Sequence, residues 1–309
     1  MIAFLKKLPP FKQLGMSFGV QRFMLILGLL IVSFFLLVAA FADFIAPYGF
    51  AQLQYADGGY FGAQQPPGDL HIWGTTVGGF DVFSRVVYGS RTALAVIFIA
   101  VILSIVVGVL LGLFSGYFAG WLDRVLVLVA DAVYAFPSLL MAIALSIVIS
   151  GGRSGFWSGI LAAGLSITVI FIPQYFRAMR AETLRIKQEA YVESAKVLGA
   201  SNNRIVFRHV FRNATRTLPI IFTLNASEAI LTLAGLGFLG FGIDPTMGAE
   251  WGYDLNRSVA DVSSGIWWTS VFPGSAIVLV VLGITLVGES LNDLADPRLR
   301  KRQVAEIND

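Results

Sequence analysis

The chain contains no cysteine, which excludes disulfides, thiolate metal sites and a cysteine nucleophile. Its two histidines, His71 and His209, are isolated from one another and cannot build a histidine-rich metal centre. Charged residues make up only 13% of the 309 residues, whereas soluble proteins carry about a quarter. No Gly-x4-Gly-Lys-Ser/Thr phosphate loop occurs, so ATP binding by that mechanism is not expected. Redox, zinc and phosphate-loop chemistry are therefore not expected of this chain.

Apolar residues dominate what is present, at 56% of the chain, and the mean hydropathy is +0.76. This composition is typical of an integral membrane protein. The pI near 9.2 could suggest a nucleic-acid partner, but the net charge is only +3 and the basic residues cluster beside apolar segments. Membrane topology explains the basicity better, and no nucleic-acid partner is expected.

Six apolar runs are long enough to cross a membrane, because about 30 Å of hydrocarbon requires about 20 helical residues. The runs lie near Phe23–Ala42, Ala93–Phe118, Val125–Ile149, Phe156–Phe176, Leu218–Phe241 and Ser270–Gly288. The first ends in Ala40-Phe41-Ala42, which resembles a signal-peptidase site, but it exceeds the about 7 to 15 residues of a signal-peptide core. We therefore expect an uncleaved anchor and an all-α fold with six transmembrane helices.

The distribution of Lys and Arg predicts the orientation, because cytoplasmic flanks are enriched in these residues. With the N-terminus inside, 18 of the 22 basic residues fall on the inner side. The four on the outer side are Arg85, Arg91, Arg153 and Arg257. Both termini are therefore expected in the cytoplasm of a multi-pass protein.

The first outer loop, roughly Asp43–Thr92, is rich in Gly, Pro, Gln and aromatic residues. Its aromatic residues include Tyr48, Tyr55, Tyr60, Phe61 and Trp73. They are expected either to meet a partner outside the membrane or to belong to an interfacial belt, where Trp and Tyr are common. The sequence favours neither alternative.

A charged, helix-prone island, Gln188–Arg212, separates two apolar runs. A central charge in hydrocarbon costs about 2.5 to 3.5 kcal/mol, so the island is expected in water, facing a soluble partner. Gln188–Leu198 is typical of a short amphipathic helix, and Gly199 suits the left-handed residue that follows one. Ser201 or Asn202 can cap a second helix. The sequence thus predicts helix, glycine turn and helix, with an ordinary solvated loop as the alternative.

Within the island, Glu193-Ser194-Ala195-x3-Gly199 resembles the cytoplasmic EAA...G loop of permease subunits of binding-protein-dependent ABC importers. Arg212 stands where these subunits usually have proline. Further stretches resemble the C-type subunit of dipeptide/oligopeptide permeases, and they are Gly74-Thr75, Asp81 to Arg85, Tyr88 to Arg91, Gly237 to Ile243, Glu250-Trp251-Gly252, Pro273-Gly274 and Asp296 to Arg300. The resemblance extends from about His71 to Arg302.

The resemblance implies a type I ABC importer permease fold in a bacterial inner membrane, with the chain forming half of the translocation pathway for di- or oligopeptides. It implies four kinds of partner: a B-type permease subunit, two cytoplasmic ATPase subunits, an extracytoplasmic substrate-binding protein and the peptide itself. ATP and Mg would bind the ATPases, while this chain would be no enzyme and would hold no cofactor or metal. The residues expected to couple to the ATPases are Glu189, Ala190, Glu193, Ser194, Ala195, Gly199 and Ala200.

Three segments follow from this organisation. Residues 1–91 would form the N-terminal tail, the first anchor and the outer loop, and residues 92–295 a five-helix permease core that includes the coupling loop 180–215. Residues 296–309 would form a cytoplasmic C-terminal tail.

Acidic residues inside spans are costly enough to be candidates for function. Asp131 precedes Pro137 in the third span, and structural pairing is favoured for it over a role in the translocation pathway. Glu228 lies deeper, in the fifth span. Members of the resembling family often carry a small residue at this position and an acid five positions later, where this chain has Leu233. Glu228 could bind the amino group of a peptide or another cation, or pair with a basic group of the partner permease. Glu289 is expected to be an anchor near the inner boundary.

Two further interpretations remain open. Gly235, Gly237, Gly240 and Gly242 at the end of the fifth span permit either close helix packing or a break. The alternative function is a secondary transporter or channel without an ATPase, which would need an inverted repeat or paired broken helices, and no two halves of the sequence resemble one another.

Overall fold

The protein is described here from a computed structural model, which describes residues 19–152 and 155–295. The helices are α3 (Gly19–Ala40), α4 (Ala42–Ile45), α5 (Val82–Phe118), α6 (Gly120–Tyr134), α7 (Ser138–Ser150), α8 (Phe156–Lys187), α9 (Ala190–Val197), α10 (Asn202–Arg204), α11 (Arg212–Ala214), α12 (Leu218–Phe238), α13 (Trp251–Ser263) and α14 (Trp268–Ala295). The described residues contain no strand, only two isolated bridges. The predicted all-α fold is confirmed, while the N-terminal tail, Arg153 and the Asp296 to Arg300 motif lie outside the described residues.

Five of these stretches are each long and apolar enough to cross a membrane as one helix. They are Val20–Ala40, Val82–Phe118, Phe156–Lys187, Asn202–Phe238 and Trp268–Asn292. Three of them extend well beyond the apolar runs in the sequence, because α5, α8 and the stretch that ends in α12 include polar helical turns that a hydropathy pattern does not register. The sixth candidate span is a bent pair, α6 and α7.

The third predicted span, Val125–Ile149, was wrong as a single helix. It consists of α6 and α7, which meet at an angle of 99°. Pro137 causes the break, since it has no N–H to continue the helix and disfavours helical backbone at the residue before it. The ψ of Pro137 itself is 123°, which directs the chain away from the axis of α6 before α7 begins at Ser138.

A glycine seam, Gly108, Gly112 and Gly116, joins α5 to α8. An added Cβ would lie 2.7 Å from the Ile172 carbonyl oxygen at Gly108 and 2.5 Å from the Phe176 carbonyl oxygen at Gly112. Small residues at this spacing let two helix backbones approach closely. This seam was not predicted from the sequence, although its glycines recur at every fourth residue.

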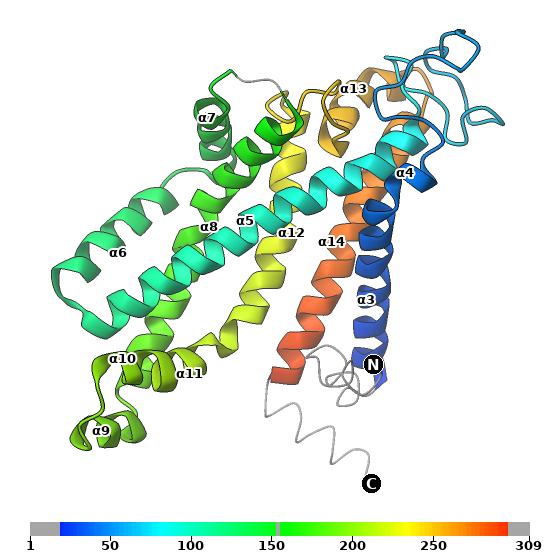
Figure 1. Cartoon of the computed structure of the whole chain (residues 1–309). Helices are drawn as coiled ribbons and strands as arrows, with labels where there is room; N and C mark the ends of the chain where they lie inside the picture. Colours follow the sequence, from blue (N-terminus) through cyan, green and yellow to red (C-terminus); the bar gives the residue numbers. More distant parts are fainter. Residues whose placement is uncertain (1–18, 153–154, 296–309) are drawn as a thin grey trace.

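The remaining helices pack beside this pair (Figure 1). α12 contacts both α5 and α14, and α3 packs against α14. The start of α3, the segment α9 to α11 and the end of α14 lie at one end of the molecule, and the loop before α5 lies at the other (Figure 1). The first of these ends is called inner and the second outer, after the topology predicted from the Lys and Arg distribution.

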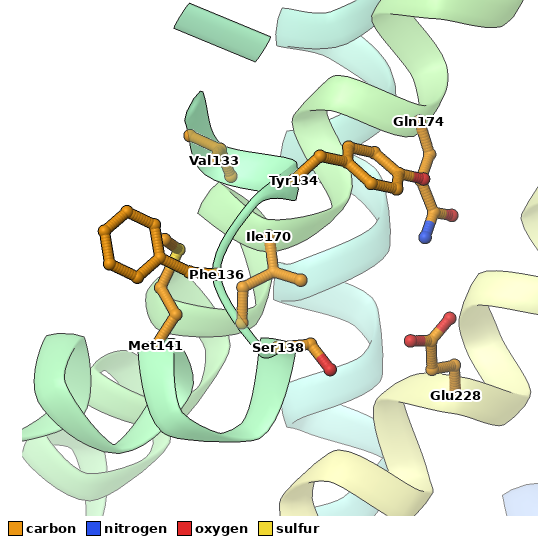
Figure 2. A pocket seen from close by; sticks show the side chains of 8 residues that line it. All are labelled: Val133, Tyr134, Phe136, Ser138, Met141, Ile170, Gln174 and Glu228. Atoms are coloured by element: carbon orange, nitrogen blue, oxygen red, sulfur yellow. The ribbon is translucent and has the colours of Figure 1, made fainter. Parts of the chain in front are cut away.

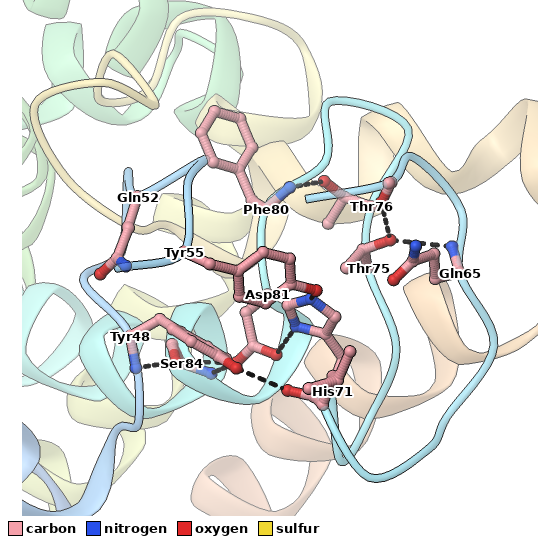
Figure 3. A network of polar contacts seen from close by, with 12 residues as sticks. Tyr48, Gln52, Tyr55, Gln65, His71, Thr75, Thr76, Phe80, Asp81 and Ser84 are labelled. Atoms are coloured by element: carbon pink, nitrogen blue, oxygen red, sulfur yellow. Dashed lines mark hydrogen bonds and ion pairs between the residues drawn. The ribbon is translucent and has the colours of Figure 1, made fainter. Parts of the chain in front are cut away.

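The outer cap, residues 46–81, is built around its own polar and aromatic centre (Figure 3). The Tyr55 hydroxyl lies 2.9 Å from His71 Nε2, and His71 Nδ1 lies 2.9 Å from an Asp81 carboxylate oxygen. The rings of Tyr48 and Phe61 pack edge-to-face at 4.8 Å. Tyr48, Tyr55 and Phe61 therefore form the cap's core, whereas Trp73 stacks on Phe272 of α14 and Tyr60 remains 74% exposed.

Candidate functional site

The inner end of α8 positions the predicted coupling segment. Lys187, the last residue of α8, donates a 2.6 Å hydrogen bond to the Tyr117 carbonyl at the end of α5. Arg185 forms ion pairs with Glu182 and Glu189, at 2.9 and 3.3 Å. The chain then turns at Gln188 and Glu189 and enters α9. These contacts attach the start of α9 to the inner ends of α8 and α5.

The first half of the island is a short helix followed by a glycine turn, as predicted. Gly199 has a φ of +77°, in the left-handed region that glycine adopts without strain. Its N–H donates to the Lys196 carbonyl at 2.9 Å, and the Ala200 N–H donates to the Ala195 carbonyl at 3.0 Å. This pair of hydrogen bonds is the Schellman motif that ends many helices.

The two faces of α9 differ in burial. Val192 is fully buried, and Ala195 and Ala200 pack against the same core. On the outward side, Val197 is 88% exposed and Leu198 86% exposed. The outward residues of the predicted set are Glu189, Ala190, Glu193, Ser194 and Gly199. The structure thus brings the predicted coupling residues to one small helix and turn, with two apolar side chains added to its exposed surface.

The second half of the island differs from the regular helix expected after Ser201. Asn202–Arg204 forms only one turn, and Ile205–Phe211 widens into a π-helix. Arg212 has helical backbone angles, φ −58° and ψ −30°, and the chain continues in helical form toward α12. Arginine keeps the N–H that proline lacks, so the helical backbone need not end here. This segment has an apolar face, with Ile205, Val206 and Val210 buried.

Asp131 and a second acid hold α6 on α8. Asp131 accepts a 2.6 Å hydrogen bond from Arg177, whose guanidinium also lies 4.3 Å from the Tyr134 ring centroid. Asp123 accepts two hydrogen bonds from Arg180, at 2.6 and 2.8 Å. Asp131 is thus paired, as the sequence analysis favoured, whereas the pairing of Asp123 was not predicted.

Glu228 lines a cavity at the break between α6 and α7 (Figure 2). The cavity measures about 250 Å³ and is lined by Val133, Tyr134, Phe136, Ser138, Met141, Ile170, Gln174 and Glu228. Figure 2 shows the Glu228 carboxylate and the Gln174 amide directed into this space, with Ser138 on the facing wall. The described residues contain no group of three or more metal-ligating side chains. The cavity can therefore offer hydrogen-bond acceptors and one carboxylate, but it has no built metal centre.

A buried polar cluster at the outer end was not predicted from the sequence. Arg85 is 1% exposed, and its Nε lies 2.7 and 2.9 Å from the two carboxylate oxygens of Asp254. Its Nη1 donates to the carbonyls of Phe50 and Pro245, at 3.1 and 3.3 Å. Arg85 thereby joins α5 to α13, the outer cap and the loop after α12. Its partner Asp254 is far away in the sequence, so spacing carried no signal for the pair.

Glu250 caps α13 from a buried position. Its carboxylate accepts hydrogen bonds from the N–H groups of Gly252 and Tyr253, at 2.8 and 2.9 Å. Burial raises the pKa of the Glu250 carboxyl to about 8, because loss of water outweighs these hydrogen bonds. Gly237 lies directly against this carboxylate, where a Cβ would overlap it, whereas Gly240 follows the end of α12 with a φ of +84°. Close packing and a helix end thus occur at different glycines of the predicted cluster.

The chain is similar in sequence to known proteins over most of its length. Residues 108–301 match the family described as binding-protein-dependent transport system inner membrane component. The chain is 34% identical to the dipeptide transport system permease protein DppC of Alkalihalophilus pseudofirmus over 275 residues, which are 89% of this chain and 86% of that protein. It is 37% identical to the glutathione transport system permease protein GsiD of Shigella flexneri over 280 residues, 91% of this chain and 88% of that protein. The corresponding GsiD of Escherichia coli is 35% identical with the same coverage.

Proposed function

The chain belongs to the binding-protein-dependent transport system inner membrane component family of ABC importer permeases, and from this premise we propose that it carries peptides across the membrane under the control of separate ATPases. The relatives named for dipeptide and glutathione transport support a short peptide as cargo. The chain would form half of the pathway, paired with a B-type permease in a bacterial inner membrane. An extracytoplasmic binding protein would deliver the peptide to the side that carries the outer cap.

The observation that carries the ATPase coupling is the exposed turn at the end of α9. Val197 and Leu198 are almost fully exposed there, and an added Cβ on Gly199 would meet no atom within 4 Å. Burying an apolar side chain of this size contributes about 1.5 to 3 kcal/mol. The turn therefore has the shape and surface of an element that inserts into a groove of another protein.

The exposed turn after α9 is connected to the cavity through α8, so a movement of the turn can reach the cavity. α9 follows α8 after a two-residue turn, α8 is joined to α5 by the glycine seam, and α8 also contributes Ile170 and Gln174 to the cavity. Closely packed elements move as bodies rather than deform continuously. When ATP draws two ATPases together, displacement of α9 would shift α8 and change which side of the pathway is open.

The segments predicted from the sequence receive distinct roles in this proposal. Residues 1–91 would supply the anchor and the surface toward the binding protein, and residues 92–295 the pathway and the coupling segment. Both termini would lie in the cytoplasm. ATP and Mg would bind only the ATPases.

The experiment that tests the coupling is a mild-detergent pull-down of the tagged chain with its partners, comparing Gly199→Trp with Gly58→Trp. Both glycines have positive φ and open space around them, but Gly58 lies in the outer cap. Gly199→Trp is expected to retain the second permease while losing most of the ATPase and all ATP-driven uptake, because the indole would obstruct the groove. Gly58→Trp is expected to retain the ATPase. Normal ATPase binding and uptake in Gly199→Trp would contradict the proposed coupling, and uptake driven by an ion gradient without any ATPase would indicate a secondary transporter.

A further inference from the structure

Among the described residues of the candidate spans, Glu228 is the acid that combines partial burial with the lack of a partner. Asp123 and Asp131 each lie 2.6 Å from an arginine nitrogen, and Glu289 is exposed near the inner end of α14. Glu228 is partly buried and makes no hydrogen bond or ion pair with another residue of the described ranges 19–152 and 155–295. An ionisable side chain at membrane depth is costly unless something compensates its charge. No described residue compensates the charge of Glu228, so a group outside the described residues is needed for this.

The cavity in front of Glu228 presents acceptors and no cationic side chain. The Gln174 amide, the Ser138 hydroxyl and the Tyr134 hydroxyl supply its other polar side-chain groups, and no Lys, Arg or His lines it. Arg177 lies one helical turn after Gln174, but its guanidinium is paired with Asp131. The basic group nearest along α8 is thus already neutralised.

The partial charges of the helix ends at the cavity do not cancel its preference for a cation. α6 ends at Tyr134 with a carboxyl terminus that favours cations, whereas α7 begins at Ser138 with an amino terminus that favours anions. Each end carries about half a charge, and the two oppose one another. The full charge of Glu228 then sets the sign of the cavity.

We propose that Glu228 binds a positively charged group of the cargo, namely the amino-terminal ammonium of a peptide, as it passes through the pathway. This inference rests on the proposed peptide transport and adds the chemical group that the pathway recognises. An ammonium has three donors and no acceptor, which suits a carboxylate supported by the Gln174 carbonyl and the Ser138 hydroxyl. A volume of about 250 Å³ accommodates one end of a peptide rather than a whole larger ligand.

A basic side chain of the second permease is the rival occupant. The cargo is favoured because one chain builds the whole acceptor set, from α6–α7, α8 and α12, around a hollow rather than a flat surface. Polar groups that converge on a concave space are the usual form of a ligand site.

The test compares two peptides in two forms of the reconstituted complex. ATP-driven uptake into vesicles is measured with binding protein saturated in turn with alanyl-alanine and with its N-acetyl derivative, which has no ammonium. The same binding protein is used with the unmodified complex and with Glu228→Gln, so its own preference cancels from the comparison. The ratio of free to acetylated uptake is expected to fall about tenfold in Glu228→Gln, the smallest loss expected when one hydrogen bond to a charged group is removed. Glu289→Gln, which removes an exposed acid lining a different cavity, is expected to leave the ratio unchanged.

Each other outcome overturns the inference in a recognisable way. An unchanged ratio in Glu228→Gln, with uptake normal, would mean that the carboxylate does not contact the amino group. An equal loss for both peptides, together with loss of the second permease in a pull-down, would assign Glu228 to the subunit interface. Absence of ATP-driven uptake of either peptide by the unmodified complex would instead refute the proposed function, and this inference with it.

Discussion

Removing the Asp254 carboxylate should release the outer cap from the membrane helices. Asp254→Ala leaves the guanidinium of Arg85 buried at 1% exposure without its negative partner. The carbonyls of Phe50 and Pro245 can still accept from Nη1, but they carry no compensating charge. Arg85 Nη2 already has no hydrogen-bond partner among the described residues. Loss of the Asp254 carboxylate would leave Nε without a partner as well.

The magnitude follows from the burial of this pair. Leaving one member of a buried ion pair uncompensated typically costs about 3 to 5 kcal/mol of stability. For a chain of 309 residues, 3 kcal/mol corresponds to a fall of about 5 °C in the unfolding midpoint. Replacing both partners by apolar residues, as in Arg85→Met with Asp254→Leu, should recover most of this loss. Recovery should be incomplete, because two backbone carbonyls would still lack their donor.

The assay is thermal unfolding of the purified chain in detergent, combined with limited proteolysis of residues 46–81. Asp254→Ala is expected to lower the midpoint and to expose the cap to protease, and the double variant to restore both. Asp43→Ala is the matched control, because it removes the same type of side chain, an aspartate, from an exposed ion pair with Arg91. Water can replace the lost partner there. A midpoint in Asp254→Ala within 1 or 2 °C of the control would refute the reasoning.

Two further predictions follow from burial and close contact. Gly112→Ala is expected to destabilise the chain by about 1 to 3 kcal/mol, because the added Cβ would lie 2.5 Å from the Phe176 carbonyl oxygen, and a normal melting temperature would contradict the seam. For Glu250, the folded pKa of about 8 lies above the unfolded value near 4.5. Its protonated form therefore adds stability below pH 4.5, and this contribution is lost as the pH rises to 8. Melting temperatures measured across this window should fall with pH more steeply in the unmodified chain than in Glu250→Gln, and equal slopes would show that Glu250 does not titrate in this range.

The spans could be predicted because a membrane-crossing helix needs about 20 consecutive apolar residues, and such a run is visible directly in the sequence. The sequence also predicted the turn at Gly199, since a left-handed residue after a helix has a recognisable local signature. The 99° angle between α6 and α7 could not be predicted in this way. Pro137 marks where the helix must end, but the direction of the next helix depends on its packing against α8.

In the candidate site, too, the sequence predicted what neighbouring residues determine and missed what contacts between distant segments determine. The residues proposed to couple to the ATPases lie within one short segment, so a local pattern could place them on one helix and turn. The pairs Asp254–Arg85 and Asp123–Arg180 join distant segments, and no local pattern indicates which charges meet. The glycine seam was readable, since Gly108, Gly112 and Gly116 are spaced for one helix face, but the pattern alone does not name α8 as the helix that they contact.

The break between α6 and α7 also restricts which side of the molecule lipid can cover. The carbonyls of Ala135 and Phe136 lie outside both helices, and no other residue of the described ranges donates a hydrogen bond to them. Acyl chains cannot satisfy such groups, so unpaired backbone at this depth must be wetted by water or covered by protein. With α6 and α7 inside the bilayer, lipid could not cover residues 135–136. The permeability barrier on that side would then have to be completed by protein or by water held against protein.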